Sequence, residues 1–395
     1  MKTSKHWPMT SLEDVAEIQT GLSKSAARQG KFVQLPYLRV ANVQDGHFDL
    51  TEIKEIDVPA DMVDRFRVRT GDVLLTEGGD FDKLGRGAVW QGQIKDCVHQ
   101  NHIFVVRPHP HKLDARFFAL QTQGPRGRAY FQSCSKQSTN LASINSTQLR
   151  QFPAAVPPLP EQCKISDILT TWDTALEKLD ALIAAKERRK KALMQQLLSG
   201  KRRYPGQIAV KFVKLSEVAK EKSIRNVNAF DRSRLFAVTK AEGMVPMRER
   251  VQGVTVNRCK IVEYGWFAYN PMRLNIGSIA RWEGSAPVMV SGDYVVFCTD
   301  EERLLSTYLH YIRQSIPWAQ FVGSSGNGGV RIRIWFDDLG RFRFPLPSLA
   351  EQQSTVTILG AADDELRLLQ AKRNMVAQQK RGLMQRLLTG KVRVR

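Results

Sequence analysis

The segment from residue 161 to 203 most strongly constrains the fold, because the patterns that begin and end it occur twice. It opens with Pro157-x-Leu-x-Glu-Gln and closes with Leu193-Met-Gln-x-Leu-Leu-x-Gly-Lys. Both patterns return 190 residues later, beginning at Pro347 and at Leu383. Two ungapped copies half a chain apart indicate the duplication of a whole unit.

Each copy predicts one long helix with a narrow apolar stripe. Its apolar residues recur at alternating steps of four and three, which keeps them on one side of a helix, as in a coiled coil. Glu161 places negative charge at the positive end of the first helix, and Gly200 is a typical C-terminal stop. At a rise of 1.5 Å per residue, this helix would be about 55–60 Å long.

The stripe predicts contact with a partner helix, for which the other copy is the nearest candidate. In the first copy the stripe comprises Ile165, Leu169, Trp172, Leu176, Leu179, Ile183, Leu193 and Leu197. In the second copy it comprises Leu359, Leu366, Leu369, Val376, Leu383 and Leu387. The polar residues Lys186, Lys190, Arg373 and Lys380 interrupt this pattern and would weaken a two-helix contact. The alternative is two separate amphipathic helices, each lying on its own domain.

The helices divide the chain into four predicted parts. These are a first globular unit (1–156), a central spacer helix (157–204), a second globular unit (205–346) and a C-terminal spacer helix (347–395). The second globular unit repeats the order of strands and turns of the first, while the contents of its loops differ. We therefore expect a mixed α/β (α+β) fold with an internal repeat, in which one scaffold carries two different recognition surfaces.

Composition restricts the class of protein. The chain has 59 Lys and Arg against 39 Asp and Glu, a net charge of +20, which favours a polyanionic partner. The five cysteines are scattered without a Cys-x-x-Cys pair, so we expect neither a disulfide framework nor a zinc site. There is no N-terminal apolar signal and no stretch of about 18 apolar residues, so we expect a soluble cytoplasmic protein.

The sequence offers no convincing catalytic or metal site. Asn270-Pro271-Met272 contains only the first half of the Asn-Pro-Pro-aromatic turn that amino-methyltransferases use. Glu52-x-Lys54 resembles a nuclease fragment, but it lacks an upstream Asp and is better explained as a solvated strand edge. Four histidines near Cys97 are candidate metal ligands without a second cluster to complete a tetrahedral site: His99, His102, His109 and His111. We therefore expect no catalytic residues, metal or cofactor.

Basic and amide side chains in Gly-rich loops favour a binding function, because such residues contact phosphates and read base edges. In the first unit the candidates are Lys83, Arg86, Lys136, Gln137, Asn140 and Asn145. In the second unit they are Arg273, Asn275, Arg281 and Asn327. For any one of them, a solvated charge or a turn-stabilising amide is the competing interpretation.

The order of variable unit, Pro-x-Leu-x-Glu-Gln helix, second variable unit and second such helix resembles the specificity subunit of Type I restriction-modification enzymes. Two further segments are similar to the target-recognition domains of that family: Tyr264–Pro271 with Ile276-Gly277, and Gln137–Leu141. The resemblance covers essentially the whole chain.

This resemblance implies two target-recognition domains held by a pair of long antiparallel helices with pseudo-two-fold symmetry. It also implies a non-catalytic subunit that binds a bipartite sequence in double-stranded DNA. Two adenine methyltransferase subunits would dock on it, and restriction (motor-nuclease) subunits would join them. The alternatives are a stand-alone DNA methyltransferase or nuclease, or a two-module nucleic-acid-binding scaffold.

Overall fold

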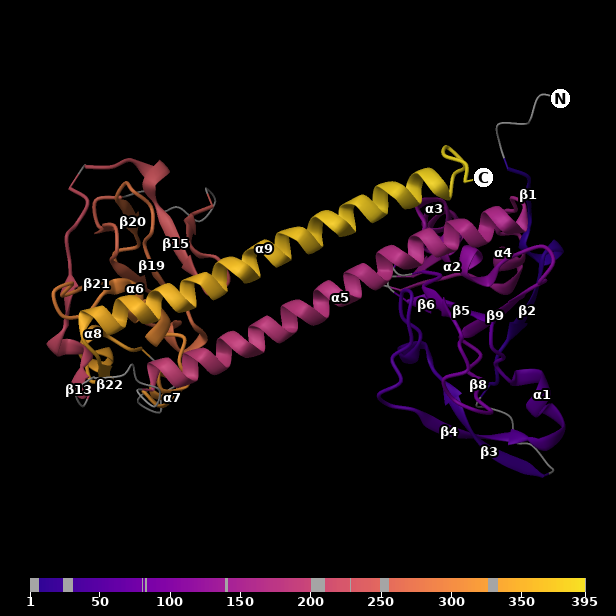
Figure 1. Cartoon of the computed structure of the whole chain (residues 1–395), viewed down its shortest axis with the longest axis horizontal. Coiled ribbons are helices and arrows are strands. Elements are labelled where there is room, and N and C mark those ends of the chain that lie inside the picture. The colour runs from indigo at the N-terminus through magenta and orange to yellow at the C-terminus, as the bar shows by residue number, and fades with distance from the viewer. Residues whose placement is uncertain are drawn as a thin grey trace. The chain divides into compact units, whose positions relative to one another are not determined.

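The two repeated segments form the longest helices of the described chain (Figure 1). Helix α5 comprises Leu159–Leu198 and helix α9 comprises Leu349–Leu387. After α9 the chain turns at Gly390, whose φ of 69° lies in the left-handed region that glycine adopts without strain. The corresponding Gly200 lies outside the described residues.

The computed structural model describes residues 7–23, 31–79, 81, 84–138, 141–199, 210–227, 229–248, 256–325 and 333–394. The chain divides into two units, each with its own core. Unit 1 comprises residues 1–179 and 372–395, and unit 2 comprises residues 180–371. Each unit therefore contains one globular part and a portion of both long helices.

The globular part of unit 1 is built on a four-stranded antiparallel sheet in the order β2-β9-β5-β7. Its strands are Ala16–Thr20, Ile103–Pro108, Val73–Thr76 and Gly87–Val89. A second sheet contains β4 (Lys54–Pro59), β3 (Phe32–Leu38) and β8 (Val98–His99). A short pair joins β1 (Met9–Ser11) to β12 (Pro153–Ala155). The helices are α1 (Val63–Phe66), α2 (Ala115–Gln123), α3 (Pro125–Cys134) and α4 (Ser146–Arg150).

Unit 2 repeats this plan. Its four-stranded antiparallel sheet has the order β14-β21-β18-β19, with strands Ala219–Lys222, Val295–Thr299, Phe267–Tyr269 and Ile279–Arg281. Strand β13 (Lys211–Lys214) pairs with β22 (Arg343–Leu346), as β1 pairs with β12. Helices α6 (Ser306–Ile312), α7 (Ile316–Ser324) and α8 (Phe336–Leu339) follow in the order of α2, α3 and α4. The predicted fold class and internal repeat are confirmed.

The two units differ in the strands inserted between these shared elements. In unit 2, β15 (Phe236–Thr239) pairs with β16 (Gly243–Pro246), and β17 (Lys260–Val262) pairs with β20 (Val288–Val290). Unit 1 has the β4-β3-β8 sheet in that part of the chain, with β3 and β8 parallel. The shared scaffold thus carries different insertions.

Every residue of the predicted stripe is buried or half-buried. Near the helix ends the stripe belongs to the globular cores: Ile165, Leu169 and Leu387 are fully enclosed in the core of unit 1. In unit 2, Leu359 is likewise enclosed, and Leu193 packs against the same core. The stripe therefore stabilises each globular part as well as the contact between α5 and α9.

Within each unit α5 and α9 run antiparallel. In unit 1, Glu161 pairs with Arg393 and Asp173 pairs with Lys380, so residue numbers rise along one helix as they fall along the other segment. Three of the four polar residues expected to weaken the contact instead form ion pairs across it: Lys380 in unit 1, and Lys186 with Glu365 and Lys190 with Asp363 in unit 2. Ion pairs thus replace apolar contacts at these positions.

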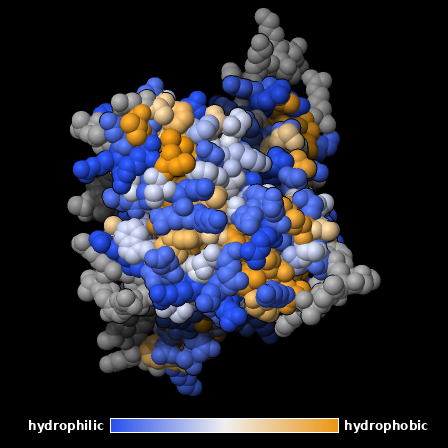
Figure 2. Space-filling view, turned by 90° about the vertical axis from the view of Figure 1, so that its left-hand side faces the viewer, coloured by the Kyte–Doolittle hydropathy of each residue, from blue (hydrophilic) through white to orange (hydrophobic). Residues whose placement is uncertain are grey.

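Figure 2 shows one face of the molecule, on which hydrophilic residues predominate and apolar residues gather in separate patches. Among the described residues, no helix combines the length and the apolar character needed to cross a membrane.

Candidate nucleic-acid interface

In unit 1 the fold brings together two predicted reading segments that are about 60 residues apart in sequence. A three-stranded antiparallel sheet joins β6 (Gly78–Gly79), β11 (Leu141–Ser143) and β10 (Lys136–Ser138). Lys136 and Gln137 therefore lie on β10, and β11 separates them from β6, where the segment that leads to Arg86 begins. Lys83 and Asn140 lie outside the described residues.

Two other candidates in unit 1 bond to the protein itself. The half-buried Arg86 donates from Nη2 to the carbonyl oxygen of Val40 at 3.2 Å. Asn145 is the N-cap of α4: its Oδ1 accepts from the backbone N–H of Gln148 at 2.8 Å, and Gln148 returns the bond. The structure thus shows a capping role for Asn145 and a loop-anchoring role for Arg86.

In unit 2 the candidates Arg273 and Asn275 lie exposed in the turn after β18. The backbone N–H of Ile334 donates to the carbonyl oxygen of Pro271 at 3.1 Å, so the segment before α8 lies beside this turn. Asn327, which belongs to the chain leading into that segment, lies outside the described residues.

Arg281 has a different environment from the other unit 2 candidates. Arg281 lies on strand β19 and is only 9% exposed. Its Nε donates a hydrogen bond to the hydroxyl of Ser306 at 3.0 Å. Its guanidinium lies 5.1 Å from the centre of the Tyr264 ring and 3.3 Å from a carboxylate oxygen of Glu283. These contacts assign Arg281 to the packing of α6 on the sheet.

The two candidate faces occupy the same position in the repeat. In unit 1 the N–H of Ile144 donates to the carbonyl of Glu77 at 2.9 Å, which matches the Ile334–Pro271 bond in unit 2. Glu77 and Pro271 each follow the central strand that pairs with β9 or β21. Each unit therefore presents variable side chains at the same end of its main sheet.

Sequence reasoning did not assign several exposed residues at these faces. In unit 2, Met272, Ile276 and Trp335 are exposed beside Arg273. In unit 1, His102 bonds Glu77, although the sequence indicated His102 only as a possible metal ligand. Glu77 directly follows β5 and His102 directly precedes β9, so the two residues meet through the pairing of these strands, which no local pattern of the sequence indicates.

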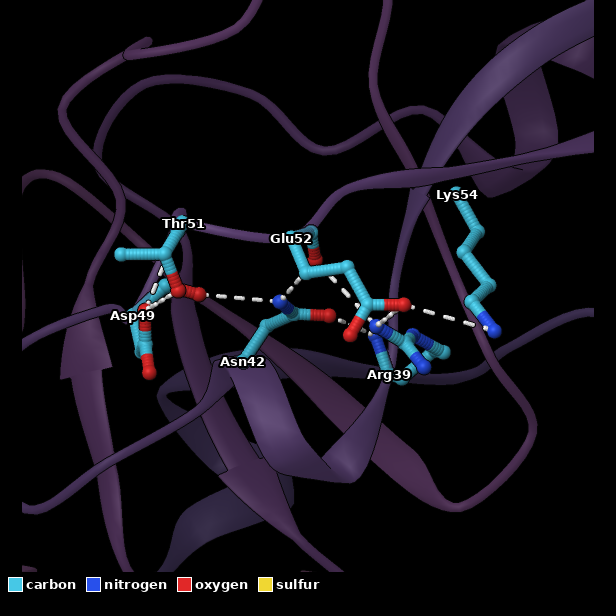
Figure 3. A network of polar contacts seen from close by, with 6 residues as sticks. All are labelled: Arg39, Asn42, Asp49, Thr51, Glu52 and Lys54. Atoms are coloured by element: carbon cyan, nitrogen blue, oxygen red, sulfur yellow. Dashed lines mark hydrogen bonds and ion pairs between the residues drawn. The ribbon is translucent and has the colours of Figure 1, made fainter.

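The nuclease-like fragment of unit 1 belongs to a polar network that shapes the loop between β3 and β4 (Figure 3). Asn42 donates from Nδ2 to the carbonyl oxygens of Asp49 and Glu52, at 2.9 and 3.0 Å. The Glu52 carboxylate lies 3.4 Å from Lys54 and 3.5 Å from Arg39. These two cations, Lys54 first, hold the pKa of Glu52 below its usual value. The Glu52 carboxylate thus stabilises the loop through its ion pairs with Arg39 and Lys54.

The candidate metal ligands lie apart. His99 is buried and donates from Nδ1 to the carbonyl oxygen of Phe66 at 3.1 Å, whereas His102 is exposed. Burial lowers the pKa of His99 to about 4 and raises that of Cys97 to about 12, so both stay uncharged at neutral pH. Within the part of the chain that the structure describes, no three His, Cys, Asp or Glu side chains are grouped to hold a metal ion.

Residues 4–186 match the family model of the Type I restriction modification DNA specificity domain. The chain is 24% identical over 416 residues to the type I restriction enzyme MjaX specificity subunit of Methanocaldococcus jannaschii, covering 98% of this chain and 94% of that protein. It is 26% identical over 157 residues to the EcoKI specificity subunit of Escherichia coli, covering 38% of this chain and 32% of that protein.

Solved structures share the fold. The HsdS subunit from Thermoanaerobacter tengcongensis superposes with a TM-score of 0.52 at 16% identity, covering 98% of this chain and 97% of that one. The S subunit from M. genitalium gives a TM-score of 0.54 at 14% identity with the same coverage. A chain from a structure describing assembly and conformational transition of a Type I restriction-modification system gives 0.61 at 15% identity, covering 99% and 100%.

Proposed function

We propose that the chain is a specificity subunit of a Type I restriction-modification system and that its two units each read one half of a bipartite DNA sequence. One observation carries this proposal: the Ile144–Glu77 and Ile334–Pro271 bonds place variable loops at the same end of two equivalent sheets. Two copies of one scaffold with different exposed side chains suit two short, unlike half-sites.

In this proposal the exposed residues Arg273 and Asn275 read bases in the half-site of unit 2. In unit 1 the base-reading residues come from the β6–β11–β10 sheet and the segments joined to it. Arg86, Asn145 and Arg281 support these faces rather than reading bases, because their side chains already bond the protein.

The helices α5 and α9 set the number of unread base pairs between the half-sites. The support is that each helix is continuous across the boundary between units, over 40 and 39 residues. A continuous helix has a defined rise per residue, so its length determines a distance.

The chain itself catalyses no reaction in this proposal, and adenine methyltransferase subunits, two by the symmetry of the repeat, act on the bound DNA. Restriction subunits join the same assembly. A duplicated unit offers equivalent docking positions to two copies of one partner.

The test lengthens both helices together. The Lys190–Asp363 pair places residue 183 of α5 opposite residue 370 of α9, so four residues are inserted after Ile183 and four after Gln370. The helices gain about 6 Å, or roughly 2 base pairs of DNA. Methylated sites are then mapped in cells that contain the methyltransferase partner.

The expected result is a longer unread spacer with both half-sites unchanged. The same four residues inserted at the exposed turn Gln91–Gln93 should leave the spacer as it was. Altered half-sites with the old spacer would contradict the proposal, and so would methyl transfer to DNA by the purified chain alone.

A further inference from the structure

Glu77 and His102 form an exposed hydrogen-bonded pair in unit 1. The Nδ1 atom of His102 lies 2.6 Å from Oε2 of Glu77, and the two side chains are 56% and 31% exposed. The backbone repeats the connection, since the N–H of Glu77 donates to the carbonyl oxygen of His102 at 3.0 Å. The pair is therefore held at a defined place while it remains open to a ligand.

That place is where the main sheet meets the three-stranded sheet. Thr76 and Ile103 form the last pair of the β5–β9 ladder, and Glu77 and His102 follow directly. The next residue, Gly78, pairs with Ser143 of β11. Three segments distant in sequence thus meet at this pair: the ends of β5 and β9 and the β10–β11 hairpin.

The contact with Glu77 determines which ring nitrogen of His102 can bind a ligand. A carboxylate can only accept, so Nδ1 carries the hydrogen in this bond. Nε2 is then the nitrogen left for a ligand; it accepts a hydrogen bond from a neutral ring and donates one from a protonated ring. Both bonds are of the kind that base edges make in the major groove.

We propose that His102 reads one base edge in the half-site of unit 1, and that Glu77 is the positioning residue that orients its ring. This inference rests on the proposed function, because it requires that unit 1 reads DNA. It adds a residue and a chemistry that the basic and amide candidates did not include.

Unit 2 has a different chemistry at the same positions. Tyr269 pairs with Val295 there as Leu75 pairs with Phe104 in unit 1. Two residues farther along each strand, Pro271 and the exposed Asp293 occupy the positions of Glu77 and His102. Unit 2 therefore has neither a histidine at the position of His102 nor, at that of Glu77, a carboxylate that could orient one. The two units differ in the side chains they offer to DNA at equivalent positions, as two unlike half-sites require.

The experiment compares His102→Ala, Glu77→Ala and Glu77→Gln in the complete complex with its methyltransferase partner. Methylated sites are mapped, and binding is measured to duplexes changed at each half-site position. His102→Ala should relax one position of one half-site, with a loss of discrimination of roughly 5- to 150-fold. Glu77→Ala should relax the same position, and Glu77→Gln, which keeps an acceptor, should retain most of the discrimination.

Two control variants make the result specific. His111→Ala removes an exposed histidine of the same unit in the connection from β9 to α2, and it should leave both half-sites unchanged. Arg273→Ala lies in unit 2, and its effect should fall on the other half-site.

Uniform weakening on all sequences would overturn the inference by making His102 a phosphate contact. Unchanged half-sites in His102→Ala would also overturn the inference about His102. If the wild-type protein still recognised a bipartite site, the proposed function would stand. Absence of any bipartite site in the wild type would instead reject the proposed function itself.

Discussion

At the scale of single residues, two histidines are held neutral by the fold. His99 is fully buried in unit 1, and its Nε2 has no hydrogen-bond partner among the described residues. In unit 2, Nδ1 of His310 accepts from Nη2 of Arg313 at 3.2 Å, which requires an unprotonated Nδ1. Burial, first among the causes, lowers the pKa of each histidine to about 4.

This predicts a loss of stability in mild acid. Between about pH 6.5 and 4 the unfolded chain binds protons at both histidines and the folded chain does not, so the free energy of unfolding falls as pH falls. The contribution is fully present above pH 6.5 and amounts to at most about 3 kcal/mol for each histidine. Urea unfolding at a series of pH values measures it.

The variants His99→Gln and His310→Gln remove these titrating groups. Each should flatten the pH dependence between 6.5 and 4, whereas His111→Gln, at an exposed position, should not. An unchanged slope in the His99→Gln, His310→Gln double variant would contradict the assignment.

At the scale of elements, α5 and α9 are held in register by ion pairs that occur at equivalent positions in the two copies of the repeat. Asp173 pairs with Lys380 in unit 1, and Asp363 pairs with Lys190 in unit 2, so both partners recur 190 residues later. The lysine side chains are 15% and 16% exposed, which means that their stems pack along the contact. Specific charge pairs at such positions favour one alignment of two helices over shifted ones.

Charge reversal in unit 1 tests this. Asp173→Lys and Lys380→Asp each place like charges together and should lower the free energy of unfolding by roughly 1 kcal/mol. The double reversal restores an opposite pair and should recover most of the loss, as measured in a double-mutant cycle by chemical denaturation. Simple addition of the two losses would show that the residues do not interact.

At the scale of the whole molecule, one glutamine near the start of each long helix forms hydrogen bonds with the backbone of its own globular part. The buried Gln162 accepts from the N–H of Asp114 at 2.8 Å and donates to the carbonyl oxygens of Lys112 and Pro157. Gln352 makes the same three bonds in unit 2, to Leu305, Arg303 and Pro347. These bonds explain the glutamine of the repeated Glu-Gln pattern, because the loop before α2 or α6 has buried backbone polar groups that need partners.

The two units should therefore respond separately to loss of their glutamine. Gln162→Ala leaves buried backbone groups of unit 1 without partners and should cost about 1–3 kcal/mol there. Hydrogen exchange should show faster opening in residues 7–179 and little change in residues 210–346. Gln352→Ala should give the reverse pattern, and equal acceleration in both units would show that they open as one.

The sequence by itself determined the elements whose signals are local. The bounds of α5 and α9 follow from residue periodicity and end signals, which act over a few neighbours. The internal repeat follows from identity of spacing, and so does the expectation that both units share a scaffold.

Only the tertiary structure decided which side chains are free to act. Asn145 and Arg281 have the residue types of base readers, but one caps a helix and the other packs beneath α6. Lys190 breaks the apolar pattern of α5, yet it lies on the contact because Asp363 is opposite. Glu77 and His102 become neighbours only across a strand ladder. These outcomes depend on partners far away in the chain, which local periodicity does not specify.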